Sequence, residues 1–223
     1  IRLQCARCHH HPFESYSQSD FYGLAAFFTR LDSKSSGTFG ELGFDAVVSL
    51  APLSAERSLK HPRTGQVVAP RPLGGDPIDT RGVLDIREPL ADWLTSPTNR
   101  LYSRNIVNRI WGHYMGTGIV EPVDDLRSTN PPTNPQLLDA LAADFVAHKF
   151  DLKHLMRRIM TSSTYQLSST SRPQHVDDRR FYTHYNVKRL PAEVLLDAID
   201  HACGTHERFP GVPPGTRAIA LPD

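Results

Sequence analysis

Two neighbouring segments in the second half of the chain constrain the fold most strongly. Residues 135–148 carry apolar side chains at helical spacing, and residues 151–161 repeat the same pattern. Asn134 and Asp151 directly precede them, where an N-cap side chain accepts a backbone hydrogen bond, and Pro135 suits a first helical turn. Because only a short turn separates the two segments, they predict an antiparallel αα-hairpin.

Three other segments also predict helices. Residues 103–115 carry a broad apolar stripe that ends before Gly116, which is typical of a largely buried helix. A shorter helix is expected over residues 89–94, and a last one begins at Pro191. Cys203 lies on the apolar pattern of that last helix, so we expect it to be a buried small side chain. The predicted fold class is therefore mainly α.

The N-terminal part has a different pattern. A short helix is expected after Asp20, which we take as its N-cap. Residues 33–43 are rich in Ser and Gly and predict a loop. The β-prone runs 44–50 and 66–69 predict a small antiparallel β-hairpin beside the Cys/His-containing N-terminus.

A Pro/Gly-rich stretch at residues 70–77 suggests a domain boundary. We expect an N-terminal segment over residues 1–75, a linker over 76–88 and a helical domain over 89–223. The chain begins without Met and stops after a Pro-rich loop, so we expect both ends to be cuts within a longer polypeptide.

Composition excludes several functional classes. A net charge of +1 gives no sign of a nucleic-acid-binding surface. The longest apolar runs are too short for a transmembrane span. There is no P-loop, no G-x-S-x-G and no G-x-G-x-x-G motif, so a conventional catalytic motif is absent from this sequence and the question of enzymatic activity stays open.

The chemistry is concentrated in a C-x-x-C-H pentapeptide formed by Cys5, Cys8 and His9. Two thiols at this spacing can bind one haem covalently, and the adjacent imidazole can be its axial ligand. Two alternatives remain open. Cys5, Cys8 and His11 have the spacing of three zinc ligands, although a fourth is missing, and the two thiols could also form a small disulfide loop.

A second haem ligand would come from farther along the chain. The histidine candidates on helical segments are His113 and His154, and His113 lies beside the apolar row of Trp111 and Met115. Met115, Met156 and Met160 lie on apolar stripes and are expected to be core residues instead.

A polar group shares the helix otherwise lined by Ile and Trp. Asn105 and Arg109 are four residues apart and so share a face. We expect Arg109 to be substantially buried and paired with Asp124 or Asp125. The alternative is an anion or substrate pocket built from these same four residues.

Several runs together resemble two domains that occur in sequence. The N-terminal runs Ile1–Phe13 and Phe21–Phe28 resemble the planctomycete-specific cytochrome-like domain. A domain of unknown function usually follows it. Six later runs resemble that second domain: 91–97, 107–111, 121–125, 130–132, 189–193 and 213–217.

The resemblance implies large, exported multidomain proteins that often carry a further cytochrome-like domain. Members commonly have an acidic residue at the position of His10, which makes His10 an unsuitable candidate for an essential ligand. The expected function is extracytoplasmic electron transfer with haem c on Cys5, Cys8 and His9. The partners would be other cytochrome-like domains of the same longer chain. No nucleic acid is expected as a partner, and no membrane span is expected within these 223 residues. The alternative is a binding or scaffold module, for carbohydrate or a partner enzyme, with zinc or no cofactor at the Cys/His cluster.

Overall fold

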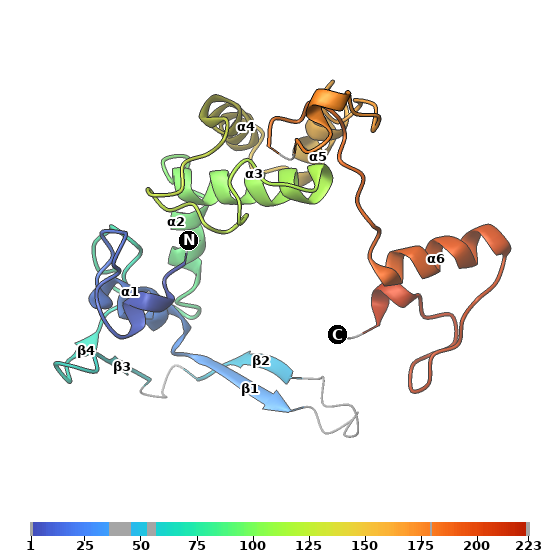
Figure 1. Cartoon of the computed structure of the whole chain (residues 1–223). Coiled ribbons are helices and arrows are strands. Elements are labelled where there is room, and N and C mark those ends of the chain that lie inside the picture. Colours follow the sequence, from blue (N-terminus) through green and yellow to red (C-terminus); the bar gives the residue numbers. More distant parts are fainter. Residues whose placement is uncertain (1, 36–45, 53–56, 179, 222–223) are drawn as a thin grey trace. The chain divides into compact units, whose positions relative to one another are not determined.

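The computed structural model describes residues 2–35, 46–52, 57–178 and 180–221, and these are mainly helical, as predicted (Figure 1). None of the described helices is both long and apolar enough to cross a membrane. The α-helices are α1 (Gln18–Ala25), α2 (Glu88–Leu94), α3 (Arg100–Met115), α4 (Pro135–Ala147), α5 (Leu152–Met160) and α6 (Ala192–Cys203). The short 3₁₀ helices are η1 (Gln4–Arg7), η2 (Ala26–Phe28), η3 (Pro173–His175) and η4 (Ala218–Ala220).

The strands form two small sheets rather than the single predicted hairpin. Strand β1 (Leu31–Ser35) pairs with β2 (Ala46–Leu50), and β3 (Leu59–Lys60) pairs antiparallel with β4 (Val67–Val68). The predicted pairing of residues 44–50 with 66–69 is therefore wrong, because each run pairs with a closer segment and so closes a shorter loop. Residues 33–35 of the predicted loop belong to β1, and the rest of that loop lies outside the described residues.

The chain divides into two compact units. The first comprises residues 1–34 and 46–186, and the second comprises residues 35–45 and 187–223. Within the second unit, the Asp197 carboxylate on α6 accepts a hydrogen bond from the Ala218 N–H at the start of η4, at 2.7 Å. The boundaries proposed at residues 75 and 88 stay a prediction.

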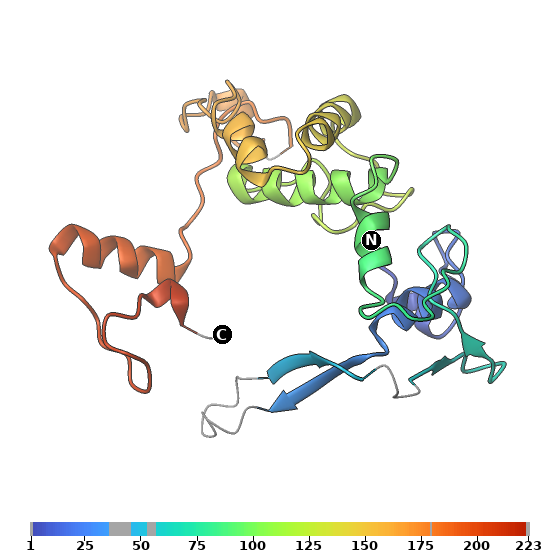
Figure 2. The same cartoon turned by 180° about the vertical axis from the view of Figure 1, so that it is seen from behind.

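The core of the first unit lies where α3, α4 and α5 meet, and both views show α4 and α5 on α3 (Figures 1 and 2). The two segments of the predicted hairpin are indeed helices in contact with each other. Their connection turns through Lys149 and Phe150, which both have positive φ, and the Phe150 N–H donates to the Phe145 carbonyl. Ten buried side chains form this core: Val107, Trp111, Met115, Ile119, Val120, Leu138, Ala142, Phe145, Leu155 and Ile159.

Most of the predicted helix ends are confirmed. Asn134 caps α4 by accepting the Leu137 N–H, and Asp151 caps α5 by accepting two backbone N–H groups. Gly116 ends α3 with φ of 78°, a conformation that glycine adopts without a Cβ clash. Asp20 is not a cap.

Ser17 takes the N-cap position of α1 instead. Its hydroxyl accepts the Asp20 N–H, while the Asp20 carboxylate accepts the Ser17 N–H at 2.7 Å. The two residues therefore form a capping box in which Asp20 is the third helical residue.

One buried polar residue fixes the loop that follows α3. Asn108 is fully buried, and its amide nitrogen donates to the carbonyls of Val120 and Val123 at 2.8 and 2.9 Å. Its Oδ1 accepts the Val120 N–H at 2.9 Å. A Cβ at Gly118 would collide with the Val120 carbonyl, so this loop needs a residue without a side chain there. Asn108 thereby positions the segment that leads to Asp124.

Candidate functional site

Cys5 and Cys8 lie on one short turn, which we call the Cys/His turn (residues 4–13). Cys5 is within η1 and Cys8 is its C-cap, with the Cys8 N–H donating to the Cys5 carbonyl at 3.3 Å. Side chains three residues apart on a 3₁₀ turn lie on the same side. Both thiols are free and exposed. The turn therefore presents two accessible thiols in one direction.

His9 is held in one tautomer. Its ring is exposed, and Nδ1 lies 2.7 Å from the His10 carbonyl oxygen. Because a carbonyl oxygen can only accept, Nδ1 must carry the proton. The lone pair is then on Nε2, which is free to bind a metal while Nδ1–H keeps the ring oriented, as in most histidine metal ligands.

His11 has the opposite arrangement. It is buried, and its Nδ1 accepts the Phe13 N–H at 3.1 Å. A neutral His11 therefore carries its proton on Nε2, and a metal could bind there only if that proton moved and this hydrogen bond broke. In the part of the chain that the structure describes, the Cys/His turn does not bring three ligand atoms within 4.8 Å of one another. The contacts of His11 suit a structural role better than that of a third zinc ligand.

Helix α1 holds the backbone of the Cys/His turn. Gln18 is 3 % exposed, and its Nε2 donates to the carbonyls of Arg7 and Cys8 at 3.0 and 3.3 Å. Its Oε1 has no hydrogen-bond partner among the described residues. Ala6, between the two cysteines, is fully buried. The turn is thus anchored through its backbone while its reactive side chains stay exposed.

The N-terminal segment also contacts the loop after α3. Arg2 forms a bidentate pair with Asp124, 122 positions away, at 3.0 and 3.1 Å. The Arg127 guanidinium lies over the Phe13 ring at 5.4 Å, and Ser128 N–H donates to the Glu14 carboxylate at 2.6 Å. These contacts join residues 2–14, which contain the Cys/His turn, to residues 124–128 within the first unit.

The predicted burial of Arg109 is wrong. Arg109 is exposed, not buried, and its Nε donates to Asn105 Oδ1 at 3.2 Å. At about 100° per residue, position 109 points away from the face of α3 that buries Val107 and Trp111. The polar residue buried on that face is Asn108, its immediate neighbour, which the apolar periodicity did not single out.

Asp124 and Asp125 have separate arginine partners. The hydrogen bond from Arg2 lowers the pKa of Asp124. Asp125, whose side chain is 3 % exposed, binds Arg127 at 2.6 and 2.7 Å, and this hydrogen bond lowers its pKa. Both carboxylates are thus held in their charged form, which disfavours a dyad that shares a proton.

Three of the four predicted pocket residues do line one cavity. Asn105, Arg109 and Asp124 face a cavity of about 390 Å³. Its other lining residues are mainly apolar or aromatic: Leu3, Leu24, Phe28, Leu73, Leu90, Trp93, Leu94, Asn99, Leu101 and Tyr102. The cavity therefore combines an apolar wall with a few polar groups, which is the usual composition of a small-molecule site.

The candidates for a second haem ligand lie on α3 and α5. His113 is exposed near the end of α3, which lies beside α5, whereas η1 contacts α1 (Figure 1). Its role stays a prediction. Met115 is a core residue, as expected, with 1 % exposure. Met156 is half-buried, and Met160 is 38 % exposed, so the core assignment of Met160 is wrong.

The predicted burial of Cys203 is also wrong, because the structure shows this residue exposed. It lies at the end of α6, which has no buried residues, and the apolar side chains of Leu195 and Ile199 on that helix are about half exposed. The apolar pattern identified the helix correctly but not the burial of its residues.

Two family models match the chain. The model PSD1, described as a protein of unknown function (DUF1553), matches residues 86–217. The model PSCyt2, described as a protein of unknown function (DUF1549), matches residues 1–33. No curated protein matches the chain, and no solved structure matches it. The two matched segments are therefore the ones that meet where Arg2 binds Asp124.

Proposed function

The chain belongs to the PSD1 family of planctomycete-type domains of unknown function, and we propose that it is a haem-binding electron-transfer protein. In this proposal Cys5 and Cys8 form thioether bonds to one haem, and His9 is the axial ligand through Nε2. The observation that carries the proposal is the 2.7 Å contact of His9 Nδ1 with the His10 carbonyl.

That contact matters because it sets both the orientation and the tautomer of the imidazole. An iron ligand needs a lone pair on the nitrogen that faces the metal, and a proton on the other nitrogen held by an acceptor. His9 meets both requirements, whereas His11 uses its Nδ1 lone pair to accept from Phe13. Of the two histidines matched to the family motif, His9 is thus the better ligand.

Gln18 on α1 has a supporting role. The Gln18 amide, by binding the carbonyls of Arg7 and Cys8, keeps the two thiols on one side of the turn. Bound haem would supply one-electron exchange between ferric and ferrous iron. The exposure of Cys5 and Cys8 would allow the maturation enzymes to reach both sulfurs.

Location and partners are part of the same proposal. Thioether formation requires reduced thiols and a maturation system outside the cytoplasmic membrane, so the protein would act in an extracytoplasmic compartment. Its electron partners would be other cytochrome-like domains of a longer chain. The packing of the N-terminal segment on residues 124–128 would couple the redox site to the PSD1 domain.

The test is expression with haem-maturation enzymes, followed by mass spectrometry of the denatured protein and a visible spectrum of the native one. We expect one haem adduct that survives denaturation and is lost in Cys5→Ser and Cys8→Ser. Cys203→Ser is the matched control and should keep the adduct, since Cys203 lies on α6, outside the motif. His9→Ala should keep the adduct but change the spectrum, whereas His10→Ala should change neither. Free thiols at Cys5 and Cys8 in protein made under these conditions would refute the proposal.

A second candidate function is favoured by the cavity that Arg109 lines. Its aromatic residues Trp93 and Tyr102 and its planar polar groups Asn105 and Arg109 suit a carbohydrate, which stacks on rings and accepts hydrogen bonds at its hydroxyls. Titration with oligosaccharides should then quench tryptophan fluorescence, and Trp93→Ala should abolish binding. Phe181→Ala, an exposed aromatic outside this cavity, should leave binding unchanged. Absence of binding to the unmodified protein would exclude this function.

A further inference from the structure

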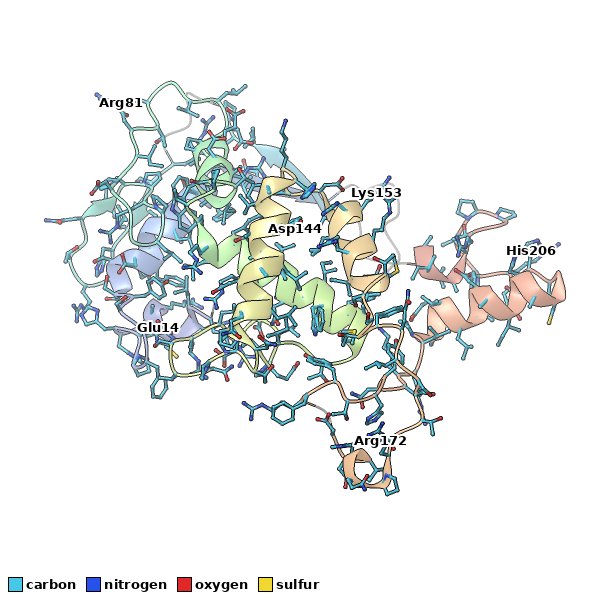
Figure 3. All side chains as sticks on the ribbon, turned by 90° about the horizontal axis from the view of Figure 1, so that it is seen from above. Glu14, Arg81, Asp144, Lys153, Arg172 and His206 are labelled. Atoms are coloured by element: carbon cyan, nitrogen blue, oxygen red, sulfur yellow. The ribbon has the colours of Figure 1, made fainter. Side chains whose placement is uncertain are left out.

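A second group of potential metal ligands lies on the α4–α5 hairpin, distinct from the Cys/His turn. Asp144 and His148 occupy successive turns at the end of α4, and His154 lies on the first turn of α5. One ligand atom from each residue lies within 4.8 Å of the others. Figure 3 shows Asp144 on α4 close to α5. We call these three residues the Asp/His cluster.

Both histidines already contact Asp144, His154 through the carboxylate and His148 mainly through the backbone carbonyl. His154 Nε2 lies 2.8 Å from Asp144 Oδ2, and His148 Nδ1 lies 2.8 Å from the Asp144 carbonyl and 3.4 Å from Oδ1. Since these oxygens accept, Nε2 of His154 and Nδ1 of His148 carry protons. The two rings are stacked, with centroids 3.6 Å apart and planes inclined by 14°.

The backbone beneath the Asp/His cluster is anchored in the core. Phe145, next to Asp144, and Leu155, next to His154, are both buried in the core. The Asp151 cap also accepts the His154 N–H at 3.1 Å, which fixes the first turn of α5. The three ligands therefore come from two helices whose separation is set by core packing rather than by the side chains themselves.

We propose that the Asp/His cluster binds a divalent transition-metal ion of the zinc class. Two imidazoles and one carboxylate are a ligand set that zinc accepts with water in a fourth position. For the ion to bind His154 through Nε2, the proton on that nitrogen would move to Nδ1 through solvent, so that the ring stays neutral, and the Asp144 carboxylate would bind the ion beside it. The stacked rings cannot both point at one ion, so His148 must turn. It can do so because it is the C-cap of α4 and its side chain is 48 % exposed.

A positive charge opposes this binding and gives the proposal a distinctive test. Arg158 Nε lies 3.7 Å from Asp144 Oδ2, and its side chain is 62 % exposed. The guanidinium competes with a cation for the carboxylate but can move into solvent. Lys153 and Arg157 on α5 add further positive charge, while the carboxylate of Asp151 offsets part of it. Arg158→Gln should therefore strengthen metal binding, an effect expected only if the ion lies at Asp144.

The experiment uses the full chain with Cys5→Ser, Cys8→Ser and Cys203→Ser, because all three thiols are exposed and would compete for the probe, zinc. Calorimetry should detect a zinc site that raises the melting temperature and is removed by a chelator. His154→Ala and Asp144→Asn should each weaken it by more than about tenfold. The matched control is His201→Ala, an exposed histidine on α6, which should bind zinc as the parent does.

The run His9–His11 remains in every variant, so only the differences between variants bear on the proposal. Circular dichroism of each metal-free variant checks that the helices persist. The proposal is overturned if His154→Ala and Asp144→Asn bind zinc as tightly as the parent. A zinc affinity in Arg158→Gln equal to that of the parent would also overturn the proposal. If His154→Ala and Asp144→Asn do not fold, Arg158→Gln is the variant that tests the proposal. Because the haem test relies on different residues, the two proposals can fail separately.

Discussion

The core of α3, α4 and α5 and the Cys/His turn use polar groups in opposite ways. In the core, Asn108 is fully buried and its amide makes three hydrogen bonds to backbone groups. In the turn, Cys5, Cys8 and His9 are exposed, and only the backbone between them is anchored. A buried polar group must be paired to be tolerated, whereas an exposed one can keep a lone pair or a thiol for a ligand. The comparison separates a region built for stability from one that can perform chemistry.

This difference predicts a gradient of mutational effects. Substitutions in the core should change the free energy of unfolding strongly. Substitutions at the junction between the two regions should have a moderate effect, and substitutions at the exposed thiols should change chemistry rather than stability.

The largest effect is expected for Asn108→Ala. The change leaves the buried carbonyl and N–H of Val120 and the partly buried carbonyl of Val123 without the Asn108 amide, at a cost of about 1–3 kcal/mol for each buried group. We expect a loss of roughly 3–5 kcal/mol in the free energy of unfolding, allowing for partial relaxation. Urea denaturation followed by the fluorescence of Trp111, which is itself in the core, measures it.

Asn105→Ala is the matched control on the same helix. Asn105 is only half-buried, and its side chain accepts one hydrogen bond from the exposed Arg109. Its removal should cost less than about 0.5 kcal/mol. If Asn108→Ala and Asn105→Ala lost similar free energies of unfolding, a buried, hydrogen-bonded amide would contribute no more to stability than one at the surface.

A smaller effect is expected for Asp125→Asn at the junction. The change removes the ionised partner of Arg127, which is itself partly exposed, so we expect a loss of about 1–3 kcal/mol at pH 7. Because the folded-state pKa of Asp125 is lowered, its stabilisation is complete above the unfolded pKa of about 3.9. The stabilisation disappears as the pH falls through the folded pKa.

The difference between Asp125→Asn and the unmodified protein should therefore shrink in acid. Unfolding curves at pH 7 and at successively lower pH values measure it. Asp79→Asn is a suitable control, because Asp79 also pairs with an arginine two residues on, but both of those side chains are highly exposed. A difference that stays constant from neutral pH into acid would show that the ionised carboxylate does not carry the stabilisation.

Gln18→Leu tests how firmly the Cys/His turn is held. It removes two hydrogen bonds to the carbonyls of Arg7 and Cys8 but fills similar space, so we expect a loss of about 1–2 kcal/mol. Under the haem proposal, it should also lower the fraction of chains that carry the adduct. Full stability together with full haem loading would mean that the turn does not depend on this side chain.

The sequence predicted best those features that depend on local pattern. The caps at Asn134 and Asp151, and the two helices that follow them, depend on short-range periodicity and backbone hydrogen bonds. The N-cap of α1 was placed three residues late because Asp20 and Ser17 form one capping box, and either residue type is common at a cap.

Long-range pairing could not be predicted from the same patterns. The periodicity of α3 marked its apolar stripe but not that Asn108, rather than Arg109, faces the core. The acidic partner of Arg2 lies 122 positions away, and nothing in either local sequence specifies it. The strand pairs were likewise chosen by loop closure and not by β propensity alone. Haem binding by the Cys/His motif stays a prediction, and the tautomers of His9 and His11 depend on backbone geometry that the motif does not specify.

The smallest effect is expected for Cys203→Ser, and it extends the comparison to the second unit. The thiol is exposed at the end of α6, so the change loses no buried contact and should alter the free energy of unfolding by less than about 0.5 kcal/mol.

In the native protein without haem, an aromatic disulfide reagent should modify all three thiols rapidly, and Cys203→Ser should remove one of them. Loading with haem should then protect Cys5 and Cys8 but leave Cys203 reactive, because only the first two would be bound in thioethers. A slow-reacting Cys203, or a large loss of stability in Cys203→Ser, would mean that the thiol is buried in solution and that the exposed face of α6 is covered.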